Sequence, residues 1–306
     1  MDSMERGARL GFGLTILILP LLCLLLYLPI LLIFFLDKEF RKASAYIIMT
    51  HIGVLDALQL VIHSYSGVLV IADVDLGIEL NKVIGAILTG LWFSGLAFTL
   101  FLTFNRLTTV LLVRWFPGLT STFLSYVLFA FCYLGFIVPF VLKLLPKCNY
   151  LFDPDTFSWT YLTTDSDLSL VMNKIGNYLV LGIVVLSVIT YASIIIYIGC
   201  YSYSKLNKRE YRITIQVSLL FLYFLFSFVY WTYLMPLFGQ SVLSDFFSCL
   251  VWVIMNGIHP FIYLVFNDRL RYSFMQLFVH LRIPQDTSSV NKTVLLVKSS
   301  KPHMIS

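Results

Sequence analysis

The sequence predicts an all-α fold, in which seven membrane-spanning helices form a bundle and an amphipathic helix follows the last of them. Two observations support this prediction. The chain of 306 residues is 59% hydrophobic and only 12% charged, with a mean hydropathy of +0.89, whereas a soluble domain carries roughly 25% charged residues. It also holds seven apolar runs of the length that crosses a bilayer, about 20 residues or more. The runs cover residues 11–36, 43–72, 83–113, 120–146, 175–203, 211–238 and 242–267.

The first run is predicted to be retained as a helix. Gly11 to Leu36 contains no charged residue, and it is far longer than the apolar segment of a cleavable signal peptide, about 7–15 residues. The second and third runs exceed what a bilayer needs, so these helices are expected to tilt or to project from it. Pro236, Gly239 and Gln240 predict a tight turn between the last two spans.

The segment after the seventh span, residues 268–283, predicts a helix that lies along the membrane surface. Its apolar residues recur at helical spacing: Leu270, Phe274, Leu277, Phe278 and Leu281. The alternative, an extension of the seventh span, would place Asp268 and three arginines in lipid at a high cost. The expected division is therefore a short extracellular N-terminus (1–10), a seven-helix domain (11–267), this surface helix and a disordered cytoplasmic tail (284–306).

The distribution of lysine and arginine predicts that the N-terminus lies outside and the C-terminus inside, because basic loops stay cytoplasmic. Fourteen of the 21 basic residues lie in loops 37–42, 114–119 and 204–212 and in the tail, and Arg106 adds one more. Only six lie on the other side.

The sequence does not indicate enzymatic activity, metal binding or nucleic-acid binding. The sequence has no GxSxG, HExxH, P-loop or GxGxxG motif and no pair of mid-membrane aspartates, so we do not expect an enzyme or a cofactor. The five cysteines lack paired spacing, which argues against a disulfide framework or a zinc site. The net charge of +5 comes from short loops and the tail, so no nucleic-acid partner is expected.

Asp56 is predicted to lie near the middle of the membrane. It is fourteen residues beyond Lys42, roughly 20 Å along a helix. A carboxylate at that depth needs hydrogen bonds, a cation or a proton. Asn256 and His259 are its best partners by depth, and a sodium ion is a further candidate. A functional polar core and a static structural network both remain open.

Arg106 interrupts an apolar run in "FLTFNRLTTVLLVRWFPG" (101–118). Its side chain could simply reach the interface from the end of the span, although Asn105 beside it suggests a role. In the seventh span, Pro260 frees a backbone carbonyl and predicts a bend, with Tyr263 on the same side. That bend is either a static kink or part of a two-state element.

An aromatic ligand pocket is predicted in the outer half of the bundle. Trp92 is fourteen positions before Arg106, roughly 21 Å outward on a helix. The other candidates are Tyr65, Tyr178, Tyr230 and Trp231. Each alone is more commonly a packing residue. An aromatic pocket without a counter-ion at membrane depth indicates a small, mostly apolar ligand.

Taken together, these features resemble a G-protein-coupled receptor, and most closely the nematode serpentine chemoreceptors of the Srt class. The matching stretches are "LYLPILL" (26–32), "HIGVLDALQLVIHSYSG" (51–67), "LWFSGLAFTLFLTFNR" (91–106) and "HPFIYLVFNDRLR" (259–271). The resemblance implies a chemosensory receptor that binds a small-molecule ligand and activates a heterotrimeric G protein. It also implies a multi-pass protein of the plasma membrane, with the cilia of sensory neurons as a candidate location.

The resemblance also assigns roles to residues. Arg106 would be restrained at rest and released toward the G protein when the sixth span swings outward. Asn105 stands where an acidic neighbour is common, so Glu210 becomes the candidate partner. Pro260 and Tyr263 complete the expected activation set.

Three departures from the family pattern lead to expectations of their own. No cysteine lies near Asn81 at the outer end of the third span, so Cys148 is predicted to be a free thiol. The second outer loop would then be held by its own contacts, with Trp159 and Tyr161 at the mouth of the bundle. The sixth span lacks a proline in its middle, and His259 stands before Pro260.

The alternative function is a ligand-gated channel or a transporter subunit. A transporter would favour internal repeats and matching broken helices, and neither is visible in the sequence.

Overall fold

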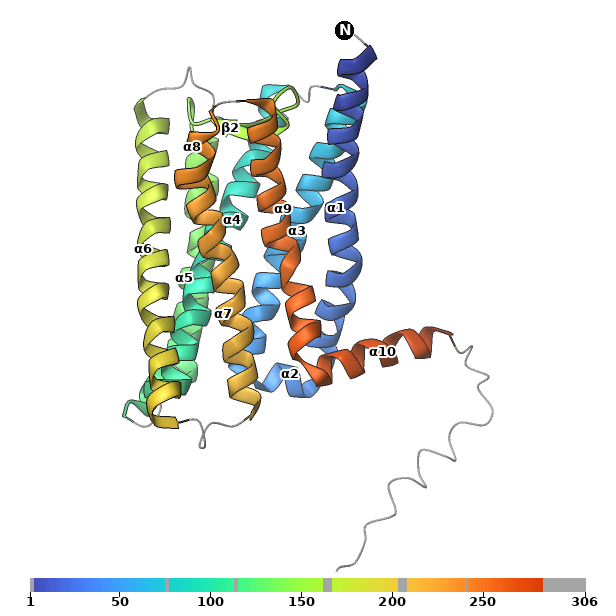
Figure 1. Ribbon diagram of the computed structural model, residues 1–306. Coiled ribbons are helices and arrows are strands. Elements are labelled where there is room, and N and C mark those ends of the chain that lie inside the picture. Colours follow the sequence, from blue (N-terminus) through green and yellow to red (C-terminus); the bar gives the residue numbers. More distant parts are fainter. Residues whose placement is uncertain are drawn as a thin grey trace, which may run out of the picture.

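The computed structural model confirms the predicted helix bundle. It describes residues 3–74, 77–112, 115–161, 167–202, 208–239 and 241–282. Within these ranges, seven helical segments are long and apolar enough to cross a membrane. They stand side by side, with the N-terminus and β2 at one end and α2 and α10 at the other (Figure 1). We call these the hairpin end and the α10 end.

The long helices are α1 (Ser3–Leu36), α3 (Ser44–Ala72), α4 (Ile78–Leu107), α5 (Thr122–Leu144), α6 (Asp167–Tyr197), α7 (Lys208–Val229) and α9 (Val242–Phe266). The short elements are α2 (Lys38–Lys42), α8 (Met235–Leu237), α10 (Asp268–Arg282) and the strands β1 (Tyr150–Asp153) and β2 (Ser158–Tyr161). π-Helical turns continue α4 over Thr108–Leu112, α6 over Ile198–Ser202 and α7 over Tyr230–Leu234, and a 3₁₀ turn covers Pro117–Thr120.

Several helices begin earlier than the apolar runs. The first starts at Ser3 instead of residue 11, the third span at Ile78 instead of 83, and the fifth at Asp167 instead of 175. An apolar run marks only the part of a helix that lies in lipid. The helix can begin earlier, because its backbone hydrogen bonds continue through polar residues beyond the bilayer.

Two loops of the predicted fold contain regular structure. The loop after α1 forms α2, where the side chain of Asp37 caps the helix by accepting from the backbone N–H of Glu39. The loop after α5 forms an antiparallel hairpin that pairs Tyr150 with Tyr161 and Asp153 with Ser158. The hairpin is a departure from the all-α expectation.

The helix after the seventh span is confirmed as α10. Asn267 has an extended backbone that ends α9, and its side-chain oxygen accepts from the backbone N–H of Leu270 at 3.1 Å. Its amide nitrogen donates to the hydroxyl of Tyr46 at 2.8 Å, which ties the junction to α3. Arg269 pairs with Asp37 at 3.0 Å. The position of α10 on a membrane surface stays a prediction, and the predicted tail (284–306) lies outside the described residues.

The outward faces of α5 and α6 are apolar. Phe123 and Phe131 on α5 and Ile196 on α6 are among the large side chains that these helices expose. Exposed apolar side chains in this number are expected of helices that face lipid. Asp56 and Arg106, by contrast, are buried inside the bundle.

Candidate functional site

At the α10 end, Arg106 is buried, with 2% of its surface exposed. Its Nη1 donates to Oε2 of Glu210 at 2.8 Å, and its Nη2 donates to Oδ1 of Asn105 at 2.6 Å. The amide of Asn105 donates in turn to Oγ of Ser44 at 2.9 Å. This series of hydrogen bonds joins α4 to both α7 and α3. The arginine therefore does not reach outward to the interface, and Glu210 is placed as its partner.

Pro260 and Tyr263 lie apart from this cluster. Both are buried in α9, and among the described residues no hydrogen bond links Tyr263 to Arg106. The Tyr263 ring stacks against His259, with centroids 6.0 Å apart. The structure thus brings together Asn105, Arg106 and Glu210, whereas Pro260 and Tyr263 belong with the polar group in mid-bundle.

That mid-bundle group is built around Asp56. The carboxylate Oδ2 lies 2.6 Å from Nδ1 of His259 and accepts from the hydroxyl of Tyr27, also at 2.6 Å. The hydroxyl proton of Tyr27 accounts for the contact between Tyr27 and Asp56. The contact between Asp56 and His259 needs a second proton, which is carried either by Nδ1 of His259 or by the carboxyl group. The predicted pairing of Asp56 with His259 is confirmed. Asn256 is buried nearby, but its Nδ2 has no partner among the described residues.

Tyr27 was not predicted from the sequence. It comes from α1 and is fully buried. The available signal was a single polar side chain within "LYLPILL", where every other residue is leucine, isoleucine or proline. No cluster of three His, Cys, Asp or Glu residues lies within the described residues, and the sodium alternative stays untested.

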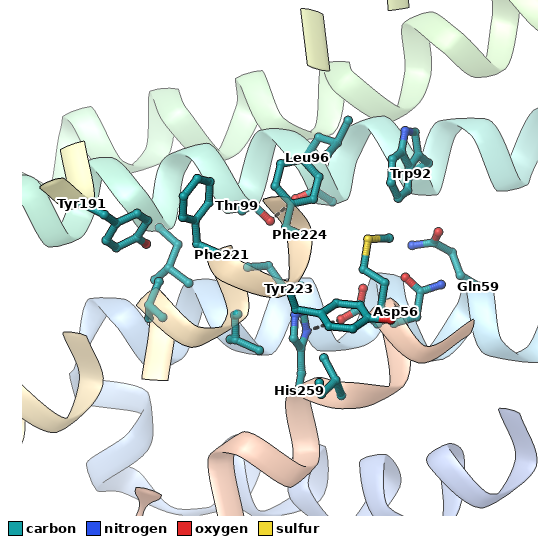
Figure 2. A pocket seen from close by; sticks show the side chains of 18 residues that line it. Asp56, Gln59, Trp92, Leu96, Thr99, Tyr191, Phe221, Tyr223, Phe224 and His259 are labelled. Carbon is teal, nitrogen blue, oxygen red and sulfur yellow. Dashed lines mark hydrogen bonds and ion pairs between the residues drawn. The ribbon is translucent and has the colours of Figure 1, made fainter. Parts of the chain in front are cut away.

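A small central cavity of about 60 Å³ adjoins this group. Figure 2 looks into it, with Trp92, Leu96 and Thr99 of α4 facing Asp56 and Gln59 of α3. Its volume suits a few water molecules.

A larger cavity of about 260 Å³ lies beneath the hairpin, and we call it the hairpin cavity. Trp92 from α4, Trp231 from the π-helical turn of α7 and Trp252 from α9 all line it. Their ring centroids are 5.3–6.4 Å apart, with edge-to-face geometry. Trp92 lines both cavities, so it separates the hairpin cavity from the central one.

The predicted pocket residues are placed in two groups. Trp92 and Trp231 line the hairpin cavity, whereas Tyr65, Tyr178 and Tyr230 line neither cavity. These two cavities do not support the assignment of the three tyrosines to a ligand pocket, which stays a prediction. Tyr178 is 72% exposed and Tyr65 38% exposed, because their positions on α6 and α3 face away from the bundle.

Trp252 was missed, although a signal existed. It precedes His259 by seven residues, two turns of a helix, and therefore shares its face. Trp159 and Tyr161, expected at the mouth of the bundle, do line the hairpin cavity, together with Tyr150.

The hairpin is attached to α4 without a disulfide. The side chain of Asn81 donates to the carbonyl of Phe152 at 2.8 Å and accepts from its N–H at 2.9 Å. Gly85 permits close approach, since a Cβ there would lie 1.9 Å from the carbonyl oxygen of Tyr150. Cys148 is a free, buried thiol, as predicted.

This arrangement defines a class of protein. The crystal structure of squid rhodopsin matches the chain with a TM-score of 0.73 and 14% identity, over 92% of this chain and 88% of that one. The fold is therefore that of a rhodopsin-like G-protein-coupled receptor. The family described as serpentine type 7TM GPCR chemoreceptor Srt matches residues 1–287, so the chain belongs to the Srt family. No curated protein matches it.

Proposed function

We propose that this protein is a chemosensory receptor of the plasma membrane. A small molecule binds in the hairpin cavity, on the extracellular side, and the α10 end activates a heterotrimeric G protein in the cytoplasm. Sensory cilia are the expected location. The proposal assigns the chain no catalytic step and no cofactor, and family membership favours a receptor over the channel or transporter alternative.

One observation carries this proposal: a single helical segment connects the cavity to the buried ion pair. Glu210 lies at the start of α7 and pairs with Arg106. Trp231 lies in the π-helical turn that continues the other end of α7 and lines the hairpin cavity. A ligand that displaces Trp231 would therefore act on the element that restrains Arg106.

The π-helical turn is the place where this mechanism requires α7 to bend. Such turns interrupt the regular hydrogen bonds of an α-helix and often occur at functional sites. In this chain the turn Tyr230–Leu234 stands in a span that lacks a proline in its middle. Movement there would carry Glu210 away from Arg106 and expose the guanidinium group to the G protein.

The test does not require the natural ligand. Glu210→Gln removes the charge of a partly buried partner, so the resting state loses on the order of 1–2 kcal/mol. We expect up to roughly tenfold higher basal nucleotide exchange on a purified G protein. Arg106→Ala should abolish exchange, both alone and in the Glu210→Gln background, at unchanged surface expression.

Lys38→Ala is the matched control, because Lys38 is an exposed cation at the same end. It should leave exchange unchanged. Full exchange by Arg106→Ala at equal surface density would contradict the proposed function.

A further inference from the structure

We propose that the hairpin cavity selects a small, uncharged aromatic ligand, with its ring against the three tryptophans and a hydrogen-bonding oxygen near Asn173 and Asn177. This inference rests on the proposed function and names the chemical class of the ligand.

The cavity offers no charge to a ligand. None of its described lining side chains is Asp, Glu, Lys, Arg or His. Burial raises the pKa of Tyr161 to about 12 and raises the pKa of Tyr150 as well, so both phenols stay neutral. A charged ligand would lose its hydration without gaining a counter-ion, which carries a high cost. Neutral ligands are therefore favoured.

A cation held by aromatic rings is the main competitor, since tryptophan and tyrosine faces attract ammonium groups. Here the ring of Tyr161 already has the ammonium of Lys143 at 4.0 Å from its centroid, and Tyr150 has it at 5.8 Å. Lys143 touches these rings without lining the cavity. A second cation would meet this positive charge and no carboxylate, so the aromatic wall is better suited to a neutral ring.

The tryptophan wall presents carbon surface. The indole N–H of Trp231 donates to Oγ of Ser248 at 3.0 Å, and that of Trp252 donates to Oε1 of Gln59 at 3.1 Å. These bonds fix both rings and engage their N–H groups. The rings can therefore offer a ligand apolar and edge-to-face contacts. A volume of about 260 Å³ lies just below the range of drug-sized sites, roughly 300–1,000 Å³. A ligand with one flat ring fits this space.

A polar wall stands on α6. Asn173 and Asn177 both line the cavity and lie one helical turn apart. Neither amide is hydrogen-bonded to another described residue. An amide can donate to a carbonyl or hydroxyl oxygen. These two side chains therefore favour a ligand that carries such an oxygen beside its ring.

Five probes of similar size separate these features: acetophenone, ethylbenzene, benzoate, benzylammonium and cyclohexyl methyl ketone. Binding is measured as a concentration-dependent rise in Tm of the full chain in lipid nanodiscs. We expect acetophenone to bind about tenfold more tightly than benzoate, benzylammonium and cyclohexyl methyl ketone. Equal or tighter binding of either ion, or no binding of acetophenone and ethylbenzene at millimolar concentration, would overturn the proposal.

Variants then locate the contacts. Asn173→Leu should reduce the affinity for acetophenone to that for ethylbenzene and leave ethylbenzene binding intact, which also shows that the variant is folded. Trp252→Leu should weaken both neutral aromatic probes. Tyr178→Leu, on the exposed side of α6, is the matched control and should change neither. Equal weakening of both probes by Asn173→Leu would contradict the polar contact.

The two proposals can fail separately. Binding of acetophenone without any nucleotide exchange, in a receptor whose Glu210→Gln variant is also silent, would contradict the proposed function alone. A benzylammonium ion that binds in the cavity and activates exchange would contradict the ligand class alone.

Discussion

At the scale of single residues, two substitutions alter the polar contacts expected of the receptor family. Asn105 stands where the resemblance implies an acidic neighbour of Arg106, and its Oδ1 accepts a hydrogen bond from the guanidinium group. His259 precedes Pro260 and meets Asp56 directly at 2.6 Å.

Asp56→Asn should destabilise the receptor, because it leaves His259 and Tyr27 without the carboxylate that both contact. Breaking a buried pair costs about 3–5 kcal/mol, whereas replacing both partners costs much less. We therefore expect Asp56→Asn to lower Tm and Asp56→Asn/His259→Asn to recover part of the loss. Additive effects of the two changes would argue against the pairing. Sodium titration of the wild type and Asp56→Asn, with nucleotide exchange as readout, tests the sodium alternative in the same samples.

At the scale of elements, the attachment of the hairpin to α4 depends on one amide. Asn81 satisfies both backbone groups of Phe152, and Lys82 adds a bond to the carbonyl of Leu145 at 2.9 Å. The roof of the hairpin cavity is therefore held by hydrogen bonds instead of a covalent link. The attachment of the hairpin should therefore depend on Asn81 and not on the redox state of the cysteines.

Asn81→Ala should loosen the hairpin by about 2 kcal/mol, since each of its two hydrogen bonds contributes about 1 kcal/mol. The measurement is hydrogen exchange of the amides in β1 and β2. A reducing agent should leave the exchange rates of the wild type unchanged. Glu79→Gln, in the first turn of the same helix, is the control. Faster exchange of the wild-type hairpin on reduction would show that a disulfide contributes.

A second restraint on α7 connects it to α10. Arg212 pairs with Asp268, which also pairs with Arg271. The hydrogen bond from Arg212 lowers the pKa of Asp268 below its ordinary value of 3.8. A depressed carboxyl pKa stabilises the folded state above that ordinary value, and this contribution is lost only as pH falls through the lowered pKa.

We therefore expect this contact to be unaffected by pH between about 5 and 8. Asp268→Asn should raise basal nucleotide exchange less than Glu210→Gln does, because Asp268 and Arg212 are exposed and water and salt screen them. Exchange assays at low and high salt check this. An effect of Asp268→Asn as large as that of Glu210→Gln would contradict this ranking.

At the scale of the whole molecule, the fold separates two ends with different contents. The hairpin end holds the larger of the two cavities described above, lined by tryptophans, and the α10 end holds Arg106 and its restraints. The proposed function requires the hairpin end to face outside. The basic loops and tail predict the same orientation.

Epitope tags at both termini test this orientation. The N-terminal tag should bind antibody on intact cells, and the C-terminal tag only after the membrane is permeabilised. A C-terminal tag that is accessible on intact cells would contradict both the orientation and the proposed site of G-protein activation.

Features that depend on hydropathy along the chain could be predicted from the sequence. The seven spans, α10, the depth that Asp56 shares with His259 and the position of Arg106 near the end of its span all follow from counting residues at helical rise. The free thiol of Cys148 followed from the absence of a partner at matching depth.

Features that depend on which way a helix faces, or on contacts distant in sequence, required the folded structure. Asn177 and Tyr178 are neighbours on α6, yet only Asn177 lines the cavity, because 100° of helical rotation separates them. Tyr27 reaches His259 across 232 residues, and Asn81 reaches Phe152 across 71. Lipid and packed protein interior are both apolar, so hydropathy sets the length of a spanning helix but not its rotation, and only packing against the other helices determines which side chains meet.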